Sequence, residues 1–278
     1  MAAPLPPSAR LSTPPAWALT RVPGLESGAD PLRVERLDGG SVNEVFRVDS
    51  RSGAFVLRLN GAAWLRPGVD RWRERRLHEA AAAAGIAPRI VAADPDREGL
   101  LITQFESGRL WRAADYSDVT ALHRLGERLA TLHALPAPAV TAFDPWSIAQ
   151  QYLAQIATLA LPAPPLEPLA RLERCCRELL ESAQSPCIAH GDLAQNNLLD
   201  GTRLWLLDWE YAQCSDALMD IACVLAYYPV ARPYAGELTA AAGLPPRPSS
   251  AELAPRLCIY ESLSWLWRLA RGETAEPP

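Results

Sequence analysis

The stretch from His190 to Ala212 decides the fold class and reads HGDLAQNNLLDGTRLWLLDWEYA. Two short apolar runs, NLL and RLWLL, flank Asp200-Gly201, a dipeptide that favours a tight hairpin turn. Because a hairpin returns the chain to the end where it began, Asn197 and Asp208 should lie towards the same open end. Amide and carboxylate oxygens are ligands that Mg²⁺ accepts in proteins, so the stretch predicts a magnesium site there.

The loop before this hairpin carries the first candidate for catalysis. His190, Asp192 and Asn197 follow the H-x-D-x-x-x-x-N spacing of a kinase catalytic loop. Phosphoryl transfer has a loose transition state, so a carboxylate need only align the attacking hydroxyl and receive its proton. We expect Asp192 to act in this way on a substrate hydroxyl, with ATP and Mg²⁺ as the phosphoryl donor, and His190 to pack the loop.

Upstream of this stretch, the residues predict a strand-rich lobe. The runs VERL, EVFRV and AFVLRL between Arg33 and Leu59 read as an antiparallel meander, and RIVAAD and GLLITQF read as two further strands. Between them, residues 70–84 are rich in Arg, Glu, Leu and Ala, and Gly85 supplies a helix stop. Five strands and one helix therefore make up the expected first lobe, residues 31–107.

Downstream of Gly108 the pattern is mostly helical, and residues 108–278 form the expected second lobe. Helices are predicted from the runs DVTALHRLGERLATLHAL, IAQQYLAQIATLA, PLARLERCCRELLESA and AELAPRLCIYESLSWLWRLARG, in which apolar residues recur every three or four positions. The Pro-rich residues 1–30 lack the continuous apolar run of a secretory signal and are expected to form a loose leader.

Two features of the first lobe predict phosphate binding. Gly39, Gly40 and Ser41 lie in the link DGGSVN between two strands, where backbone N–H groups and a hydroxyl could meet phosphates, although a plain turn would look the same. Arg58 lies in the third strand, and a guanidinium binds phosphate in a bidentate way. Glu74 and Glu79 in the following helix are both available as its partner, and the spacing leaves that choice open.

Composition excludes several other classes of protein. The 278 residues carry 27 basic and 32 acidic side chains, and the net charge of −5 disfavours a nucleic-acid partner. All the basic residues are arginines, which excludes a P-loop lysine and Schiff-base chemistry. No apolar run is long enough to span a membrane. The six cysteines form no C-x-x-C pair and mostly lie in apolar surroundings, so buried free thiols in a reducing cytoplasm are expected.

The decisive stretch also resembles a known family. HGDLAQNNLLDGTRLWLLDWEYA is similar to the catalytic segment of choline/ethanolamine kinases, within the aminoglycoside phosphotransferase and protein-kinase-like superfamily. LDGGSVNEVFRV resembles that family's Gly-Gly-x-x-Asn loop, which adds Asn43, and VDRWRERRLHEAAAAAGIAP resembles the helix after its third strand, which favours Glu74 as the partner of Arg58. The resemblance implies an α+β, bilobal, protein-kinase-like fold, with nucleotide at Gln104, Phe105 and Glu106. It implies Asp192 as base, Asn197 and Asp208 as metal ligands, and Asp216 and Asp220 as residues that brace the loop.

The acceptor follows less directly from the sequence. Choline-type kinases hold a quaternary ammonium against aromatic faces with the help of carboxylates. Residues of these types are available here: Trp209, Glu210, Tyr260, Glu261, Trp265 and Trp267. Helical spacing turns Trp267 away from Glu261 and Trp265, and core packing of the tryptophans is the competing interpretation. A small cationic alcohol such as choline or ethanolamine is the expected acceptor. Thiamine, an amino sugar or an aminoglycoside would need similar features. A nucleotide-binding pseudokinase is disfavoured because the catalytic residues are present, and a protein kinase because no activation loop follows Asp208.

Overall fold

The computed structural model describes residues 11–37, 43–60, 67–95, 99–137, 142–182, 185–246 and 248–278. The chain divides into two compact units. Unit 1 comprises residues 1–109 and 199–210, and unit 2 comprises residues 110–198 and 211–278. The expected boundary lay between residues 107 and 108. The segment 199–210, which was expected in the second lobe, packs with unit 1 instead.

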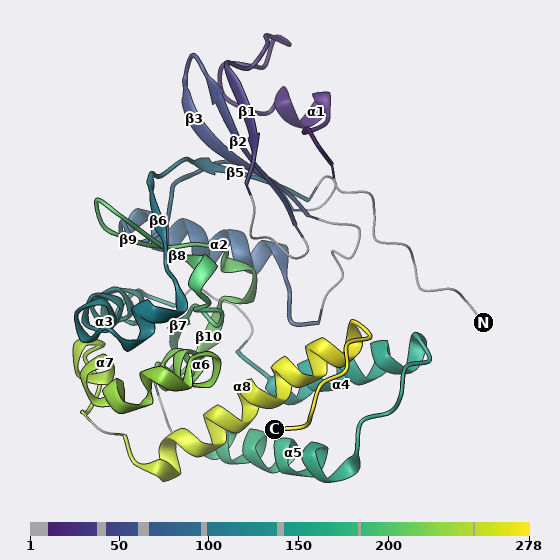
Figure 1. Cartoon of the computed structure of the whole chain (residues 1–278), viewed down its shortest axis with the longest axis vertical. Coiled ribbons are helices and arrows are strands. Elements are labelled where there is room, and N and C mark those ends of the chain that lie inside the picture. Colours follow the sequence, from purple (N-terminus) through teal and green to yellow (C-terminus); the bar gives the residue numbers. More distant parts are fainter. Residues whose placement is uncertain are drawn as a thin grey trace. The chain divides into compact units, whose positions relative to one another are not determined.

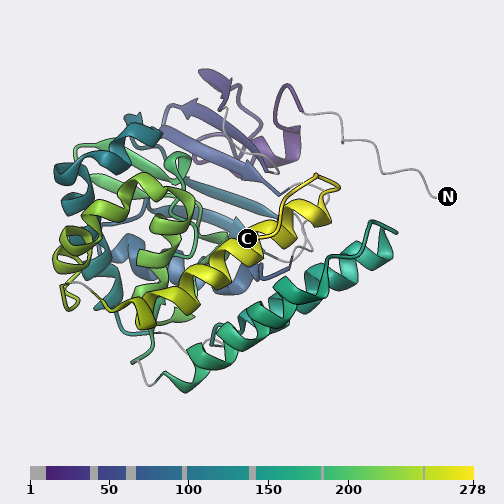
Figure 2. The ribbon, with the colours of Figure 1, turned by 60° about the horizontal axis from the view of Figure 1, so that its bottom comes forward.

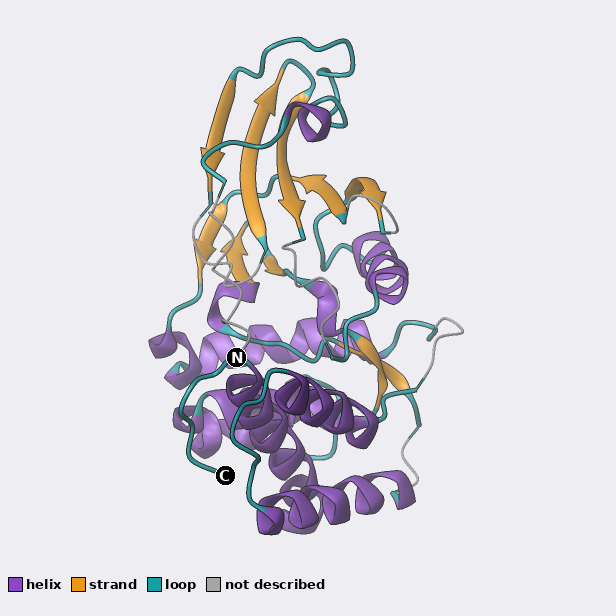
Figure 3. Cartoon of the chain, turned by 90° about the vertical axis from the view of Figure 1, so that its right-hand side faces the viewer, coloured by secondary structure: helices purple, strands orange, loops and turns teal. Residues whose placement is uncertain are grey.

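Unit 1 is built on a five-stranded antiparallel sheet with the order β1-β2-β3-β5-β4 (Figure 1). β1 to β3 form the predicted meander, and the register of β3 on β5 places Arg58 opposite Leu101. Figure 3 shows these strands in orange. Their bounds are β1 Arg33–Arg36, β2 Glu44–Ser50, β3 Gly53–Leu59, β4 Ile90–Asp94 and β5 Leu100–Gln104. The five predicted strands are confirmed.

Helix α2, Arg71–Ala83, is the predicted helix of unit 1. Its first turn is capped by Asp70, whose carboxylate accepts hydrogen bonds from the backbone N–H groups of Trp72 and Arg73. Gly85 follows the helix with φ of +72°, a left-handed conformation that glycine adopts without a Cβ clash. The capping residues at both ends therefore fix where the helix begins and ends.

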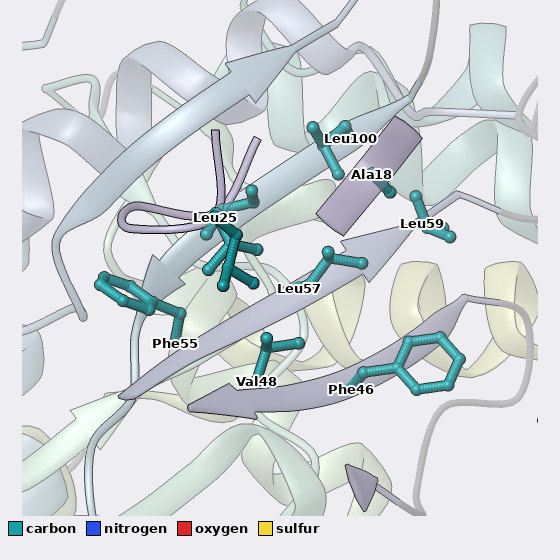
Figure 4. Close-up of a cluster of buried hydrophobic side chains, with 10 residues drawn as sticks. Ala18, Leu25, Phe46, Val48, Phe55, Leu57, Leu59 and Leu100 are labelled. Atoms are coloured by element: carbon teal, nitrogen blue, oxygen red, sulfur yellow. The ribbon is translucent and has the colours of Figure 1, made fainter. Parts of the chain in front are cut away.

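The expectation of a loose leader is wrong for residues 11–30, because part of this segment packs into the core of unit 1. Helix α1, Ala16–Leu19, and the turn after it bring Ala18, Val22 and Leu25 against one face of the sheet, all essentially buried. Figure 4 shows Ala18 and Leu25 among the apolar side chains of β2, β3 and β5. Three apolar side chains are enough to fix the segment, since each buries surface that water would otherwise contact.

Unit 2 is mainly helical. Its long helices are α3 Val119–His133, α4 Pro145–Thr158, α5 Leu166–Glu181 and α8 Ser250–Ala270, all predicted, joined by the unpredicted α6 Leu218–Tyr227 and α7 Ala235–Ala241. Figure 2 shows α4 and α5 running beside α8, and each of them packs against it. Two short strands, β7 Cys187–Ala189 and β10 Gln213–Ser215, pair antiparallel within the unit. The α+β class, with a strand-rich first unit and a helical second, is confirmed.

The predicted hairpin is present, with its turn two residues later than expected. β8 Leu198–Gly201 and β9 Leu204–Leu206 flank a turn at Thr202 and Arg203, and together with β6 Gly108–Leu110 they make a three-stranded sheet. The backbone N–H of Leu206 donates to the carbonyl of Ile86 at 2.9 Å, which ties β9 to the segment after α2. The end of the hairpin that leads to Asp208 is therefore held within unit 1.

All six cysteines are free and buried, as the composition predicts. Among the described residues, no helix combines the length and the apolar character that crossing a membrane requires.

Candidate active site

In unit 1, Arg58 is the centre of a buried ion-pair network. Its guanidinium lies 2.5 Å from Oε1 of Glu74 and 2.9 Å from Oδ1 of Asp208. The choice of partner that the spacing left open is therefore decided: Glu74 pairs with Arg58, whereas Glu79 pairs with Arg75 on the exposed side of α2. The guanidinium of Arg58 in β3 thus joins two other parts of unit 1: α2, which carries Glu74, and the segment after β9, which carries Asp208.

The network continues through a second arginine, which the sequence interpretation missed. Nη1 of Arg71 donates to Oε2 of Glu74 at 2.7 Å and to Oε2 of Glu210 at 3.1 Å. The same oxygen of Glu210 accepts a hydrogen bond from Nδ2 of Asn43, also at 3.1 Å. Arg71 lies three residues before Glu74 on α2, and that helical spacing was the available signal. Two arginines and three carboxylates therefore share one buried cluster.

The charge of this cluster decides the ionisation of Arg58. Burial alone would lower the pKa of its guanidinium, but the carboxylates of Glu74, Asp208 and Glu210 outweigh burial and hold the pKa above its usual value. Arg58 is therefore permanently cationic in the folded protein. A buried cation beside a partly exposed carboxylate can exchange that partner for a phosphate group.

Asp208 has an unusual backbone. Its φ of +57° lies in the left-handed region, which costs a residue with a Cβ about 1 kcal/mol. The neighbouring Trp209 is fully buried, donates from Nε1 to the carbonyl of Leu206 at 3.0 Å and lies 5.9 Å from the His78 ring. The side chain of Asp208 remains 32 % exposed, so the strained turn directs this carboxylate towards solvent.

In unit 2, Asp192 and Asn197 are in direct contact. Nδ2 of Asn197 donates to Oδ2 of Asp192 at 2.8 Å and to the carbonyl of the same residue at 2.9 Å. The backbone N–H of Asp192 lies 3.3 Å from Nδ1 of His190, which is fully buried and so packs the loop as expected. With its nitrogen used in this way, Asn197 retains its amide oxygen as the group that suits a cation.

The buried carboxylate of Asp220 anchors the loop that carries Asp192. This carboxylate is fully buried and accepts hydrogen bonds from the backbone N–H groups of His190 at 3.0 Å and Gly191 at 2.9 Å, and it lies 3.0 Å from Nε2 of His133. Burial alone would raise the pKa of Asp220, but these partners outweigh it and the pKa lies below its usual value. Asp220 is thus an ionised structural carboxylate.

Gly191 is required by the backbone at this point. Its φ is +76°, and a Cβ at this position would lie 2.7 Å from the carbonyl oxygen of Tyr211. Any side chain would therefore push the loop away from its support. The glycine and the carboxylate of Asp220 together define where Asp192 lies within unit 2.

Tyrosines surround this loop, and the sequence interpretation named Tyr260 alone among them. The hydroxyl of Tyr116 donates to the carbonyl of Leu193 at 2.7 Å, and its ring stacks on Tyr228 with centroids 3.6 Å apart. Tyr227 and Tyr260 form an edge-to-face pair with centroids 6.3 Å apart. Burial, together with nearby negative groups that include Asp192, raises the pKa of Tyr227 and of Tyr260 well above the usual value of a tyrosine. For Tyr227 and Tyr228, the available signal in the sequence was the adjacent pair of tyrosines in LAYYP.

The residues expected to bind the acceptor do not gather in one place. Trp209 and Glu210 lie inside unit 1, where they pack against His78 and bind Arg71. In unit 2, Trp265 is buried and donates from Nε1 to the carbonyl of Ala275 at 3.1 Å. Glu261 pairs with Arg232 at 3.2 Å. This geometry favours core packing for both tryptophans and argues against a direct role for Trp209 and Glu210 in acceptor binding.

The expected nucleotide contacts lie at the end of β5. Gln104 ends that strand, and the ring of Phe105 lies 4.1 Å below the guanidinium of Arg47. Partial burial raises the pKa of Glu106, an effect that Arg203 partly opposes. Gly39, Gly40 and Ser41 lie outside the described residues, so their expected contacts with phosphate stay predictions.

The donor set fits a magnesium ion that also binds phosphate. Within the described ranges, no group of three His, Cys, Asp or Glu side chains converges on one point, as a site made of protein ligands alone would require. Asp208 instead offers one carboxylate in unit 1, and Asn197 offers one amide oxygen in unit 2. Mg²⁺ keeps several waters and takes one or two carboxylates together with phosphate oxygens, so donors of these types suit it.

The fold of unit 1 and the loop of unit 2 define a phosphotransferase with the protein-kinase-like architecture. The chain belongs to the phosphotransferase enzyme family, whose sequence profile matches residues 33–253. No curated protein matches the chain.

Solved structures of two kinds share the fold. A choline/ethanolamine kinase family protein from Mesorhizobium loti superposes with a TM-score of 0.75 at 24% identity, over 94% of this chain and 87% of that one. The choline kinase LicA from Streptococcus pneumoniae has a TM-score of 0.75 at 19% identity, over 91% and 89%. A thermostable mutant of the aminoglycoside phosphotransferase APH(4)-Ia, in a ternary complex with ADP and hygromycin B, has a TM-score of 0.62 at 17% identity, over 89% and 90%.

Proposed function

We propose that this protein is an ATP- and Mg²⁺-dependent kinase that phosphorylates the hydroxyl of a small cationic alcohol, most simply choline or ethanolamine. The observation that carries the proposal is the contact between Asp192 and Asn197 in a loop anchored by the buried Asp220. A carboxylate fixed in this way is what a transfer reaction dominated by positioning requires.

Each residue then has a role that its surroundings support. Asp192 orients the acceptor hydroxyl and receives its proton as the phosphoryl group arrives. Arg58 exchanges the carboxylate of Asp208 for the α- and β-phosphates, while Glu74 keeps its guanidinium in place. Asn197 and Asp208, which flank one hairpin in the sequence, would hold Mg²⁺ by their oxygens. When bound, Mg²⁺ neutralises charge on the β- and γ-phosphates.

The nature of the acceptor is supported by the aromatic groups of unit 2. Tyr227 and Tyr260 are close enough to Asp192 for its negative charge to raise the pKa of both phenols. Aromatic faces beside a carboxylate attract an organic cation. The proteins named above as choline or choline/ethanolamine kinases share the fold, which agrees with this class of acceptor. Glu261, which follows Tyr260 in α8, remains a candidate, whereas Trp265 is buried in the core.

The proposal is tested by ATP consumption with a panel of acceptors: choline, ethanolamine, thiamine, glucosamine and kanamycin. We expect choline or ethanolamine to give the largest kcat/KM. Turnover of kanamycin alone would place the chain with the antibiotic kinases, and no turnover with any member would contradict the choice of acceptor class.

The role of Asp192 is tested by Asp192→Asn, which keeps the shape of the side chain and removes its basicity. We expect kcat to fall by about 10³-fold or more while ATP still binds, because a base that is also the positioning group is lost. Binding of ATP is measured by calorimetry. Loss of ATP binding in this variant would contradict a role confined to the acceptor.

A further inference from the structure

Glu210 lies two residues after Asp208, and its anchoring bears on that strained residue. Its side chain is buried and accepts hydrogen bonds from Arg71 and Asn43, both at 3.1 Å. Before Asp208, β9 is tied to Ile86, and Trp209, directly after Asp208, is tied back to Leu206. A left-handed aspartate persists only where the chain on both sides is fixed, and here it is fixed on both sides.

The two arginines of the cluster differ in what a nucleotide would do to them. Arg58 contacts the partly exposed Asp208 directly, so a phosphate group competes for it. Among the described residues, Arg71 forms ion pairs only with the buried Glu74 and Glu210, and its side chain is 7 % exposed. The chain Glu74–Arg71–Glu210 can therefore stay intact while Arg58 changes partner.

We propose that Arg71 and Glu210 are positioning residues that hold the carboxylate of Asp208 in the orientation that binds the nucleotide-associated divalent cation. The inference rests on the proposed use of ATP with Mg²⁺ and deepens it. Arg71 touches neither nucleotide nor cation in this scheme. It acts through Glu210 on the backbone of Asp208. Asn43 adds a neutral hydrogen bond to Oε2 of Glu210, the oxygen that also accepts from Arg71.

The measurement is the ATP affinity of the full chain by calorimetry, with Mg²⁺ and with EDTA, which gives the factor by which Mg²⁺ improves binding. In Arg71→Gln we expect this factor to fall about tenfold, as when one charge-assisted hydrogen bond is lost, with ATP affinity in EDTA changed less than about twofold. Arg71→Lys should restore part of the loss, because an ammonium keeps the charge but not the planar shape and the reach of the guanidinium.

Arg75→Gln is the matched control. Arg75 lies one turn further along α2, is 37 % exposed and pairs with Glu79, so its loss should leave the Mg²⁺ factor unchanged. Glu210→Gln removes the other half of the pair and keeps its shape, so it tests the inference even where Arg71→Gln fails to fold.

The outcomes separate the inference from the function on which it rests. A wild-type protein that binds ATP better with Mg²⁺, beside Arg71→Gln and Glu210→Gln variants with the same Mg²⁺ factor, would overturn the inference alone. An equal loss in Arg75→Gln would also overturn it. A wild-type protein that binds no ATP, or binds it equally in EDTA, would overturn the proposed function and the inference together.

Discussion

Two buried carboxylates, one in each unit, hold candidate catalytic groups by different means. Asp220 in unit 2 binds the backbone N–H groups of His190 and Gly191 and the side chain of His133. Within the described part of the chain, the carboxylate of Glu74 in unit 1 binds side chains alone, the guanidinium groups of Arg58 and Arg71. One carboxylate therefore fixes the chain itself, and the other fixes movable cations.

The difference matches what each group would have to do in the phosphoryl transfer that we propose. The loop with Asp192 must present its carboxylate at one place, and backbone donors hold it there because they cannot rotate away. Arg58 must release Asp208 when phosphates arrive, and a side-chain ion pair permits that exchange. Substitutions of Asp220 and of Arg58, a partner of Glu74, should therefore differ in how much they change stability and nucleotide affinity.

The largest effect is expected from Asp220→Ala. It leaves two backbone N–H groups and His133 without their acceptor in a fully buried place. We expect the free energy of unfolding to fall by about 3–5 kcal/mol, as when one member of a buried charged network is removed. Urea denaturation measures it. Glu261→Ala, at an exposed ion pair, is the control and should change stability by less than about 0.5 kcal/mol. A similar small change in Asp220→Ala would contradict the backbone-anchor role.

The contribution of Asp220 should also depend on pH in a defined direction. The folded-state pKa of Asp220 lies below its ordinary value of 3.8 because His133 and the backbone donors outweigh burial. The ionised carboxylate therefore contributes its full stabilisation at pH values above the pKa that Asp220 has in the unfolded chain. This stabilisation is lost as the pH falls through the folded-state pKa. The difference in unfolding free energy between wild type and Asp220→Asn should shrink below about pH 4. A difference that grows on acidification would contradict this sign.

A smaller loss of stability, with a larger loss of binding, is expected from Arg58→Met. Glu74 keeps Arg71 as a partner and Asp208 is partly exposed, so we expect about 2 kcal/mol of destabilisation. Nucleotide affinity should fall about 10–100-fold, since a charged contact with phosphate is lost. Calorimetry with ATP measures this. An unchanged affinity would contradict the phosphate role of Arg58 and leave it a structural residue of β3.

Much of the fold and of the candidate site could be predicted from the sequence, because the patterns that indicate them are local. The spacing between Asp192 and Asn197 and the alternation along β1 to β5 lie within short windows. The preference for Glu74 over Glu79 came from a family resemblance, and the ion pair with Arg58 agrees with it. Local patterns of this kind survive folding because the helix and strand repeats place those residues on one face.

The remainder depends on contacts between distant residues. Glu210 meets Arg71 across 139 positions and Asn43 across 167, and nothing in the sequence pairs them, so Glu210 was interpreted as a substrate residue. Trp209 was misplaced for the same reason. The packing of Ala18 and Val22 on the sheet was missed because a segment interrupted by prolines shows no clear apolar period.

The smallest effect is expected from His133→Gln, which separates the two kinds of partner that Asp220 has. Glutamine can still donate a hydrogen bond towards the carboxylate, while the backbone donors of His190 and Gly191 are untouched. We expect a loss of about 1 kcal/mol in the free energy of unfolding, the usual net value of one hydrogen bond. His123→Gln is the matched control, since His123 lies on the same helix with its side chain 60 % exposed and should leave stability unchanged. If His133→Gln costs as much as Asp220→Ala, the side-chain pair and not the backbone holds the loop, and the contrast with Glu74 disappears.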